Sequence, residues 1–183
     1  MEHFYENIPG WFDFGNIYSV MINLATPGSH FVEVGSWKGK SAAYMCVEIA
    51  KSGKDIKFDC VDIWTGAGVV GEYDADESVK QQTLYDEFLA YMKPAEGLYT
   101  PVKEWSDKAA ALYADASLDF VFIDAGHTYE NASADIKAWL PKVKPGGFIA
   151  GHDYGSAPGV NRAVNELLTG FDVDINSWIV QVK

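Results

Sequence analysis

Cysteine is scarce in this chain of 183 residues, which contains only Cys46 and Cys60. Both fall in apolar segments, and neither has a C-x-x-C partner or a histidine at metal-binding spacing. The pattern therefore argues against a disulfide framework and against a cysteine-ligated metal. We expect both thiols to be reduced and buried in the core.

Basic residues are also few, with 14 Lys and Arg against 26 Asp and Glu and a formal net charge of −12. No stripe of Lys or Arg offsets this charge, which repels a phosphate-rich partner over a long range. We therefore expect the protein to bind neither nucleic acid nor an anionic membrane.

The chain lacks long apolar runs, Pro/Ser-rich linkers and internal repeats. Its longest apolar runs are far too short to span a membrane, and its first residues lack the basic end and apolar middle of a signal peptide. The 48% hydrophobic and 22% charged residues are typical of a folded domain. The sequence predicts one cytoplasmic domain over residues 1–183, in which residues 1–28 form an aromatic and helical cap.

Two segments have roles that the sequence leaves open. Trp11, Phe12 and Phe14 cap the core, contact a second copy in a homodimer, or shape an acceptor pocket together with the loop around residues 64–73. Residues 65–77 are rich in glycine and acidic residues, which predicts a long surface loop able to act as a lid.

Apolar runs and turn signals alternate regularly along the chain. They predict strands at residues 30–34, 56–63, 98–102, 118–124 and 148–151, with a terminal hairpin of 173–175 and 178–182. Helical spacing predicts helices at residues 17–24, 41–51, 79–92, 109–113, 132–140 and 160–168. This alternation implies an α/β, doubly wound, mostly parallel sheet that binds its ligand at the carboxyl ends of the strands.

The segment F-V-E-V-G-S-W-K-G-K-S, residues 31–41, predicts a strand, a glycine turn and a helix that place free backbone N–H groups beside a ligand. A P-loop needs four residues between its first glycine and Gly-Lys-Ser, but Gly35 and Gly39 are separated by three. A dinucleotide loop needs a glycine where Trp37 stands. The remaining candidate is S-adenosylmethionine (SAM), because the loop offers a carboxylate at Glu33 and suits an amino acid group rather than phosphates.

Polar side chains close four of the predicted strands: Glu33, Asp62, Asp124, and the pair His152 and Asp153. The two oxygens of Asp62 are suited to both hydroxyls of a ribose. Asp124 follows a run of apolar residues, where a charge is costly unless it is paired or faces a cleft, and His127 lies three residues further on. Because these strand ends meet at one edge of the sheet, we expect a functional site there.

An ordered set of motifs supports this expectation. It consists of E-V-G-x-x-x-G-x-S from Glu33, S-L-D-F-V-F-I-D-x-G-H-x-Y-E from Ser117, D-I-x-x-W-L-P from Asp135, and K-P-G-G followed by G-H-D-Y, which ends at Tyr154. Over roughly residues 30–168 the chain resembles class I SAM-dependent methyltransferases. The most similar branch is the small one of predicted sugar and antibiotic (macrocin-like) O-methyltransferases.

The resemblance implies a Rossmann-like seven-stranded sheet whose last strand is antiparallel. It also implies that the loop from Glu33 to Ser41 holds the methionine part of SAM, that Asp62 holds the ribose, and that residues 105–107 lie beside the adenine. The cofactor-binding residues expected on this basis are Glu33, Gly35, Ser36, Trp37, Gly39, Ser41, Asp62, Ser106 and Asp124.

The chemistry at the strand ends allows two mechanisms. Metal-dependent relatives hold a divalent ion with acidic residues at these positions, and Asp124 and Asp153 are present here, but His152 replaces the first acid of the second pair. Imidazole is a poor ligand for Mg²⁺ and a better one for Mn²⁺, so Asp124, His152 and Asp153 form a candidate metal site. Without a metal, His127 or His152 would act as general base, and His127 is favoured.

The function predicted from the sequence is SAM-dependent methylation of an oxygen on a small hydroxylated acceptor such as a sugar. The catalytic candidates are His127, Asp124 and His152. A SAM- or nucleotide-binding module without catalysis is the alternative if the histidines face away from the cofactor. An NAD-dependent oxidoreductase is disfavoured by Trp37.

Overall fold

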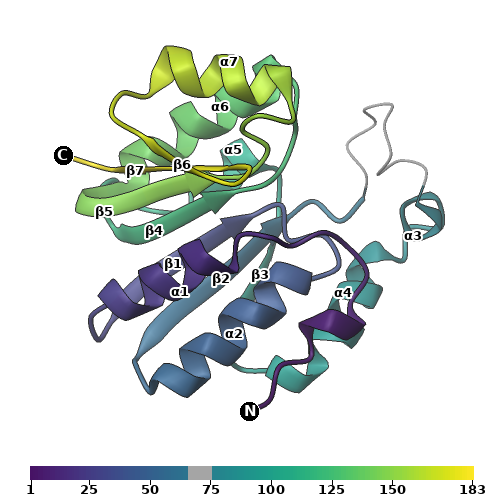
Figure 1. Cartoon of the computed structure of the whole chain (residues 1–183). Coiled ribbons are helices and arrows are strands. Elements are labelled where there is room, and N and C mark those ends of the chain that lie inside the picture. The colour runs from purple at the N-terminus through teal and green to yellow at the C-terminus, as the bar shows by residue number, and fades with distance from the viewer. Residues whose placement is uncertain (66–75) are drawn as a thin grey trace.

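A seven-stranded sheet with helices on both faces forms the body of the protein (Figure 1). This computed structural model describes residues 1–65 and 76–183. The strands are β1 (Ser29–Val34), β2 (Ile56–Asp62), β3 (Thr100–Lys103), β4 (Leu118–Ile123), β5 (Val143–Gly151), β6 (Asp172–Asp174) and β7 (Ser177–Gln181). The α-helices are α1 (Gly15–Leu24), α2 (Lys40–Ser52), α3 (Glu77–Lys80), α4 (Leu84–Met92), α5 (Ser106–Ala110), α6 (Tyr129–Trp139) and α7 (Pro158–Leu167). Short 3₁₀ helices lie at η1 (Tyr5–Asn7), η2 (Lys93–Ala95) and η3 (Leu140–Lys142).

The strand order is β3-β2-β1-β4-β5-β7-β6. Strands β1 to β5 pair in parallel, and β7 runs antiparallel to both β5 and β6. The predicted doubly wound sheet with an antiparallel terminal strand is therefore confirmed. The chain order reverses between β1 and β4, and in sheets of this kind the crevice at that point is where ligands bind.

Strand β4 contributes side chains to the apolar layers on both faces of the sheet. Phe120 and Phe122 pack in the layer with α1, α2 and α4, whereas Val121 and Ile123 pack in the layer with α5, α6 and α7. All four side chains are buried, with at most 7% of the surface of each exposed. The unbroken apolar run of this strand follows from its being covered on both faces.

The predicted helix over residues 79–92 is wrong, because two helices occupy this segment. Helix α3 begins after Asp76, whose side chain accepts a hydrogen bond of 2.9 Å from the backbone N–H of Ser78. The chain then turns at Gln82, where φ is +58°, before α4 begins at Leu84. The apolar periodicity came only from the α4 half, so it carried no information about this turn. Most of the predicted lid loop, residues 66–75, lies outside the described residues.

Both cysteine thiols are free and buried, as predicted. Cys46 lies on α2 and Cys60 on β2, and burial raises the pKa of each thiol. In the described part of the chain, no helix is long and apolar enough to cross a membrane.

Residues 8–14, here called the N-terminal strap, precede α1 and run past the carboxyl ends of the strands (Figure 1). Phe14 is 3% exposed and stacks on Phe122 with ring centroids 4.3 Å apart. Trp11 is 59% exposed and stacks on Trp37 at 5.7 Å. The strap is therefore anchored in the core by Phe14 and contacts the β1–α2 loop through Trp11.

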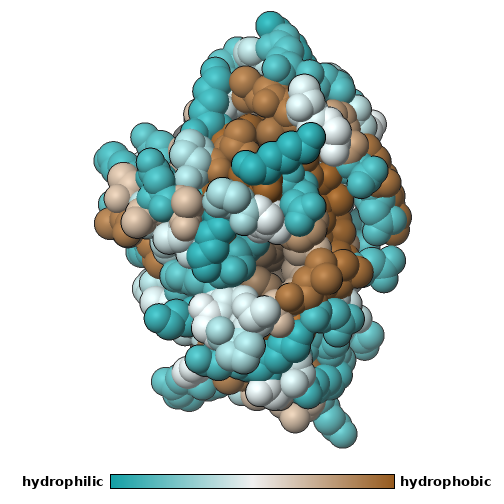
Figure 2. Space-filling model, turned by 90° about the vertical axis from the view of Figure 1, so that its left-hand side faces the viewer, coloured by the Kyte–Doolittle hydropathy of each residue, from teal (hydrophilic) through white to brown (hydrophobic). Residues whose placement is uncertain are grey.

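The amino ends of the strands form the opposite edge, where apolar surface is interspersed with polar side chains (Figure 2). There His30 on β1 and the hydroxyl of Tyr113 both lie 2.8 Å from the same oxygen of Asp59 on β2. The three side chains border or adjoin an open groove of about 550 Å³. These contacts connect β1 and β2 to the segment before β4, at the opposite edge of the sheet from the carboxyl ends of the strands.

Candidate functional site

Gly35 joins the ends of β1 and β4. Its φ is +94°, and a Cβ atom added to it would lie 1.8 Å from the backbone oxygen of Asp124. No side chain fits at that distance, so only glycine lets the two backbones meet at the reversal of strand order. Gly39, with φ of +92°, immediately precedes α2, and the side chain of Met92 lies 2.8 Å from the Cβ position added to it. Both glycines of the predicted cofactor loop are thus required by close approach.

Asp62 holds the backbone of this loop. Its Oδ2 accepts a hydrogen bond of 2.8 Å from the N–H of Trp37, and its Oδ1 accepts one of 2.7 Å from the N–H of Trp64. The indole N–H of Trp64 donates to the carbonyl of Trp37 at 2.7 Å. Burial raises the pKa of Asp62, and the two backbone N–H groups partly offset this. Each carboxylate oxygen accepts one bond from the loop and retains a lone pair for a ligand hydroxyl.

Glu33 lies beneath the loop and is only 1% exposed. Its Oε2 accepts a hydrogen bond of 2.5 Å from the hydroxyl of Tyr18 on α1. Burial raises the pKa of Glu33 to about 7, although Tyr18 and the hydroxyls of Ser36 and Ser41 act in the opposite direction. Among the described residues, Oε1 of Glu33 and Oγ of Ser36 have no hydrogen-bond partner of good geometry. A buried acceptor in this position suits an ammonium donor from a ligand.

Ser106 begins α5 but its hydroxyl is engaged by another helix. The indole N–H of Trp139 on α6 donates to Oγ of Ser106 at 2.9 Å. The neighbouring side chain of Trp105 is 48% exposed. At this strand end the structure therefore presents an indole to the surface, while the hydroxyl of Ser106 fixes α5 against α6.

Asp124, His127, His152 and Asp153 lie together at the ends of β4 and β5 and are here called the edge cluster. Nε2 of His127 lies 2.9 Å from Oδ2 of Asp153. Nδ1 of His152 lies 3.6 Å from Oδ1 of Asp153 and 3.9 Å from Oδ1 of Asp124. One donor atom from each of Asp124, His152 and Asp153 falls within 4.8 Å of the others. The structure thus brings together all the residues predicted for catalysis and for the metal.

Local backbone geometry supports the edge cluster. Asp153 adopts φ of +64°, and its Oδ1 accepts a hydrogen bond of 2.9 Å from Ser156. The start of α7 packs so closely on the segment after His127 that a Cβ on Gly159 would lie 2.5 Å from the carbonyl oxygen of His127. Strain at a non-glycine residue with positive φ is common where a side chain must point into a site.

The carboxylates and imidazoles of the edge cluster change one another's proton affinity. Burial opposes the charge of His152, but Asp153, Asp124 and Asp13 outweigh it and raise the pKa of His152 to about 9. Close contact with Asp153 raises the pKa of His127. Burial raises the pKa of Asp124 to about 6, whereas the two imidazoles hold the pKa of Asp153 well below its usual value despite burial. At neutral pH His152 is therefore protonated, and the carboxylates of Asp124 and Asp153 are charged.

A cavity of about 20 Å³ adjoins the edge cluster. It is lined by Asp124, Gly126, His127, His152 and Asp153 together with apolar side chains of α6, α7 and β7. This space is enough for one water molecule or one metal ion.

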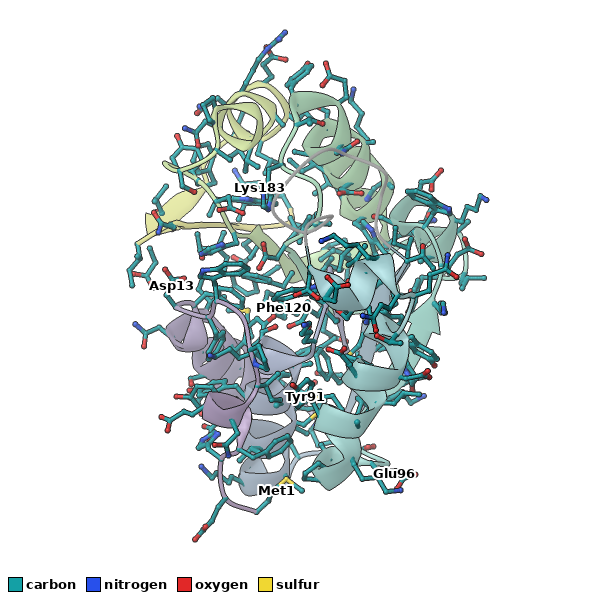
Figure 3. All side chains as sticks on the ribbon, turned by 90° about the vertical axis from the view of Figure 1, so that its right-hand side faces the viewer. Met1, Asp13, Tyr91, Glu96, Phe120 and Lys183 are labelled. Carbon is teal, nitrogen blue, oxygen red and sulfur yellow. The ribbon has the colours of Figure 1, made fainter. Side chains whose placement is uncertain are left out.

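Sequence reasoning missed Asp13 and Tyr18. Asp13, which is labelled in Figure 3, lies on the strap. Its Oδ1 is 2.8 Å from Nε2 of His152, which places it in the site although 139 positions separate the two residues. Tyr18 lies on the buried face of α1, and the sequence alone does not distinguish it from an ordinary aromatic residue of the core. Neither residue belongs to a local pattern, so only the tertiary structure identifies them.

The chain matches a family described as a methyltransferase domain over residues 32–154. A curated relative, the uncharacterized protein y4gI of Sinorhizobium fredii, is 25% identical over 153 residues, which cover 82% of this chain and 16% of that protein. This chain therefore spans less than a fifth of the length of that relative.

Three solved structures share the fold. The O-methyltransferase NovP has a TM-score of 0.71 at 18% identity, with 92% of this chain and 79% of that chain covered. Cofactor-bound Rv0187 from MTB has a TM-score of 0.67 at 14% identity, with coverage of 96% and 83%. The calicheamicin methyltransferase CalS11 has a TM-score of 0.63 at 12% identity, with coverage of 92% and 77%.

Proposed function

The chain belongs to the methyltransferase domain family that matches residues 32–154, and we propose that it transfers a methyl group from SAM to an oxygen of a small hydroxylated acceptor. The observation that carries this proposal is the position of the glycine loop and the edge cluster. They meet at one edge of the sheet, where Gly35 touches the backbone of Asp124. Both lie inside the matched region, so the proposed cofactor site and the proposed reaction site adjoin each other.

The residues of the β1 and β2 ends fit SAM. The unpartnered Oε1 of Glu33 and the hydroxyl of Ser36 would receive the methionine group, together with the loop through Trp37 and Gly39 to Ser41. The free lone pairs of Asp62 would accept the ribose hydroxyls, and the segment around Ser106 would border the adenine. Bound SAM supplies an electrophilic methyl group on a sulfonium, so the protein has to position the acceptor oxygen and exclude water.

His127 is our candidate for the general base that takes the proton of the acceptor hydroxyl. Its side chain is 35% exposed, and Asp153 holds the ring at 2.9 Å. Asp153 raises the pKa of His127, which makes the neutral imidazole a stronger base but reduces the fraction that is neutral at pH 7. His152 is the second candidate, but a pKa of about 9 keeps it protonated at neutral pH unless a cation displaces its proton.

The donor set of the edge cluster also fits a divalent cation. Asp124, Asp153 and Nδ1 of His152 offer two carboxylates and one imidazole nitrogen within 4.8 Å. Such a mixed set suits Mn²⁺ better than Mg²⁺ or Ca²⁺, and a bound ion would acidify an acceptor hydroxyl. A cation at these residues would also favour the neutral forms of both imidazoles, because its charge opposes their protonation.

The acceptor is proposed as a small hydroxylated molecule, such as a sugar. The formal net charge of −12 disfavours polyanionic acceptors. Two structural neighbours are by their names an O-methyltransferase and a methyltransferase of calicheamicin. The alternative of a binding module without catalysis is less well supported, because His127 and His152 lie at the same edge as the glycine loop.

The test is transfer of label from methyl-labelled SAM to a library of hydroxylated small molecules, with and without Mn²⁺. We expect labelled product that is stable to base, as an ether is. Activity that falls after chelation and returns with Mn²⁺ but not with Ca²⁺ would support the metal site, and full activity after exhaustive chelation would remove the metal from the mechanism. SAM binding without label transfer to any compound of the library would instead favour the binding module.

A further inference from the structure

One carboxylate of the site, that of Asp13, comes from outside the matched family region and outside the strands. Asp13 lies on the N-terminal strap, and its Oδ1 is 2.8 Å from Nε2 of His152. Its Oδ2 is 3.5 Å from the side-chain amide of Asn176 in the turn between β6 and β7. The next residue, Phe14, is buried and lies 5.1 Å from the His152 ring. The strap thus contacts one nitrogen and one side of this imidazole.

The two nitrogens of His152 face different carboxylates. Nε2 faces Asp13, whereas Nδ1 faces Asp124 and Asp153 at 3.9 and 3.6 Å. A neutral imidazole has one proton, which stays on the nitrogen with the better hydrogen-bond acceptor. The contact of 2.8 Å to Asp13 is far shorter than either contact of Nδ1, so the proton belongs on Nε2. Nδ1 is then left with a lone pair directed at Asp124 and Asp153.

We infer that Asp13 is a positioning residue that fixes the ring and the tautomer of His152 so that Nδ1 is presented to Asp124 and Asp153. Histidine ligands of metals are commonly held in this way by a carboxylate on the other ring nitrogen. The inference rests on the proposed function in taking His152 as part of the reacting site. It adds that this site is complete only when the N-terminal strap is in place.

Asp13 also differs in exposure from the two acids that face Nδ1 of His152. Its side chain is 43% exposed, compared with 25% for Asp124 and 19% for Asp153. Replacing it leaves no cavity in the core, so variants of Asp13 are expected to fold. Asp13→Asn keeps an oxygen that accepts from Nε2–H and removes only the charge, whereas Asp13→Ala removes the acceptor itself. These two variants separate positioning from charge.

The first measurement needs no metal and no acceptor. Long-range ¹⁵N–¹H spectra of the histidine rings, recorded at alkaline pH where His152 is neutral, report which nitrogen carries the proton. We expect the Nε2–H form in the wild type and in Asp13→Asn. In Asp13→Ala we expect a shift toward Nδ1–H, because the remaining carboxylates face Nδ1. An Nδ1–H form in the wild type, or an unchanged tautomer in Asp13→Ala, would overturn the inference.

The second measurement is calorimetric titration of the metal-free full-length chain with Mn²⁺ and Zn²⁺. We expect Asp13→Ala to weaken binding by about 10-fold or more, and Asp13→Asn to weaken it much less. The control is Asp172→Ala, which removes the same charge at an exposed position on β6 and should leave the affinity unchanged. Equal losses in Asp13→Ala and Asp13→Asn would mean that charge alone matters, which contradicts positioning.

The two proposals can fail separately. Absence of metal binding by the wild type would contradict the proposed cation, and the tautomer of His152 would then decide the role of Asp13 by itself. Thermal unfolding of each variant shows whether a change reflects the site or the fold. A tautomer shift in a variant that melts with the wild type supports the inference.

Discussion

The edge of the sheet at the carboxyl ends of the strands has two halves: the cofactor half, with Glu33 and Asp62, and the edge cluster. The carboxylates of Glu33 and Asp62 accept hydrogen bonds from neutral donors. The carboxylates of Asp124 and Asp153 instead face imidazoles. The donors in the first half are a tyrosine hydroxyl and backbone N–H groups, which do not give up their protons near neutral pH. The donors in the edge cluster are histidines, which can give up a proton near neutral pH.

This difference matches the two tasks that we propose for the site. Carboxylates held by neutral donors keep spare lone pairs and a fixed geometry, which suits the recognition of an ammonium group and a ribose. Carboxylates paired with imidazoles can take up a proton or pass it between them, and a bound cation can displace it. Gly35 is the point where the two halves touch.

The largest effect is expected from closing the junction with a methyl group. Gly35→Ala places a Cβ at 1.8 Å from the backbone of Asp124 at a positive φ, so the ends of β1 and β4 must separate. We expect a loss of more than about 3 kcal/mol in the free energy of unfolding. Urea titration of the purified variant measures this loss.

The matched control for Gly35 is Gly53, which also has a positive φ, of +66°, but no neighbouring atom within 4 Å of an added Cβ. Gly53→Ala should lower the free energy of unfolding by only about 1 to 2 kcal/mol, which is the cost of placing alanine in the left-handed conformation. Equal losses in the two variants would show that backbone conformation, and not the contact between β1 and β4, explains the requirement for glycine.

The second prediction concerns Glu33 and pH. The pKa of Glu33 is about 7 in the folded protein against an ordinary 4.5, so the folded state binds more protons between these values. Stability therefore falls as pH rises through this window, by up to about 3 kcal/mol once pH exceeds 7, since each unit corresponds to about 1.4 kcal/mol. Glu33→Gln mimics the protonated acid, so it should be more stable than the wild type at pH 8 and similar to it at pH 4.5.

Urea unfolding of wild type and Glu33→Gln at the two pH values tests this prediction. Glu2→Gln removes an exposed carboxylate and serves as the control, with no change in the pH dependence. A variant less stable than the wild type at pH 8 would mean that the charged form of Glu33 is well accommodated. We also expect Glu33→Gln to bind SAM more weakly, because a neutral amide replaces the carboxylate proposed to bind the ammonium group of SAM.

The third prediction compares two histidines that are paired with aspartates in similar ways. His127 lies 2.9 Å from Asp153 at the carboxyl edge, and His30 lies 2.8 Å from Asp59 at the amino edge. His127→Ala should lower turnover by about 10²-fold or more while leaving SAM affinity nearly unchanged, as expected for a lost general base. His30→Ala should leave turnover intact and affect only stability. Steady-state kinetics with calorimetry measures both, and comparable turnover in the two variants would remove His127 from catalysis.

The fourth prediction concerns Asp62, with Asp55 at the other end of the same strand as control. Asp62→Ala should weaken SAM binding by about 1.5 to 3 kcal/mol, because it removes the charged acceptor of two hydrogen bonds. Asp62→Asn keeps one acceptor for the loop and should lose less. Asp55 is exposed, and Asp55→Ala should bind SAM as the wild type does. Calorimetry that finds no loss in Asp62→Ala would assign Asp62 to loop support alone.

Most of the fold followed from the sequence because the strands are buried and the turns carry glycine and proline. The apolar run from Phe120 to Ile123 predicts a buried strand, and the segment from Phe31 to Ser41 predicts a strand, a glycine turn and a helix. Helix ends were less certain, since the turn at Gln82 has no apolar signal. The position of the edge cluster was predictable because parallel strands end at the same edge.

The protonation of the cluster was not predictable in the same way. The raised pKa of His152 depends on carboxylates from three separate segments, which carry Asp13, Asp124 and Asp153. The partner of Glu33 comes from α1, and no spacing in the sequence relates Tyr18 to it. Such contacts are set by how the strap and α1 pack on the sheet, so tertiary structure alone reveals them.

We propose that the cofactor half binds a nucleoside with an amino acid group and not one with phosphates. Calorimetric titration of the wild type with SAM, its demethylated product, ATP and NADH tests this most directly. We expect SAM and its demethylated product to bind clearly more tightly than ATP or NADH. Tighter binding of ATP or NADH than of SAM would contradict it.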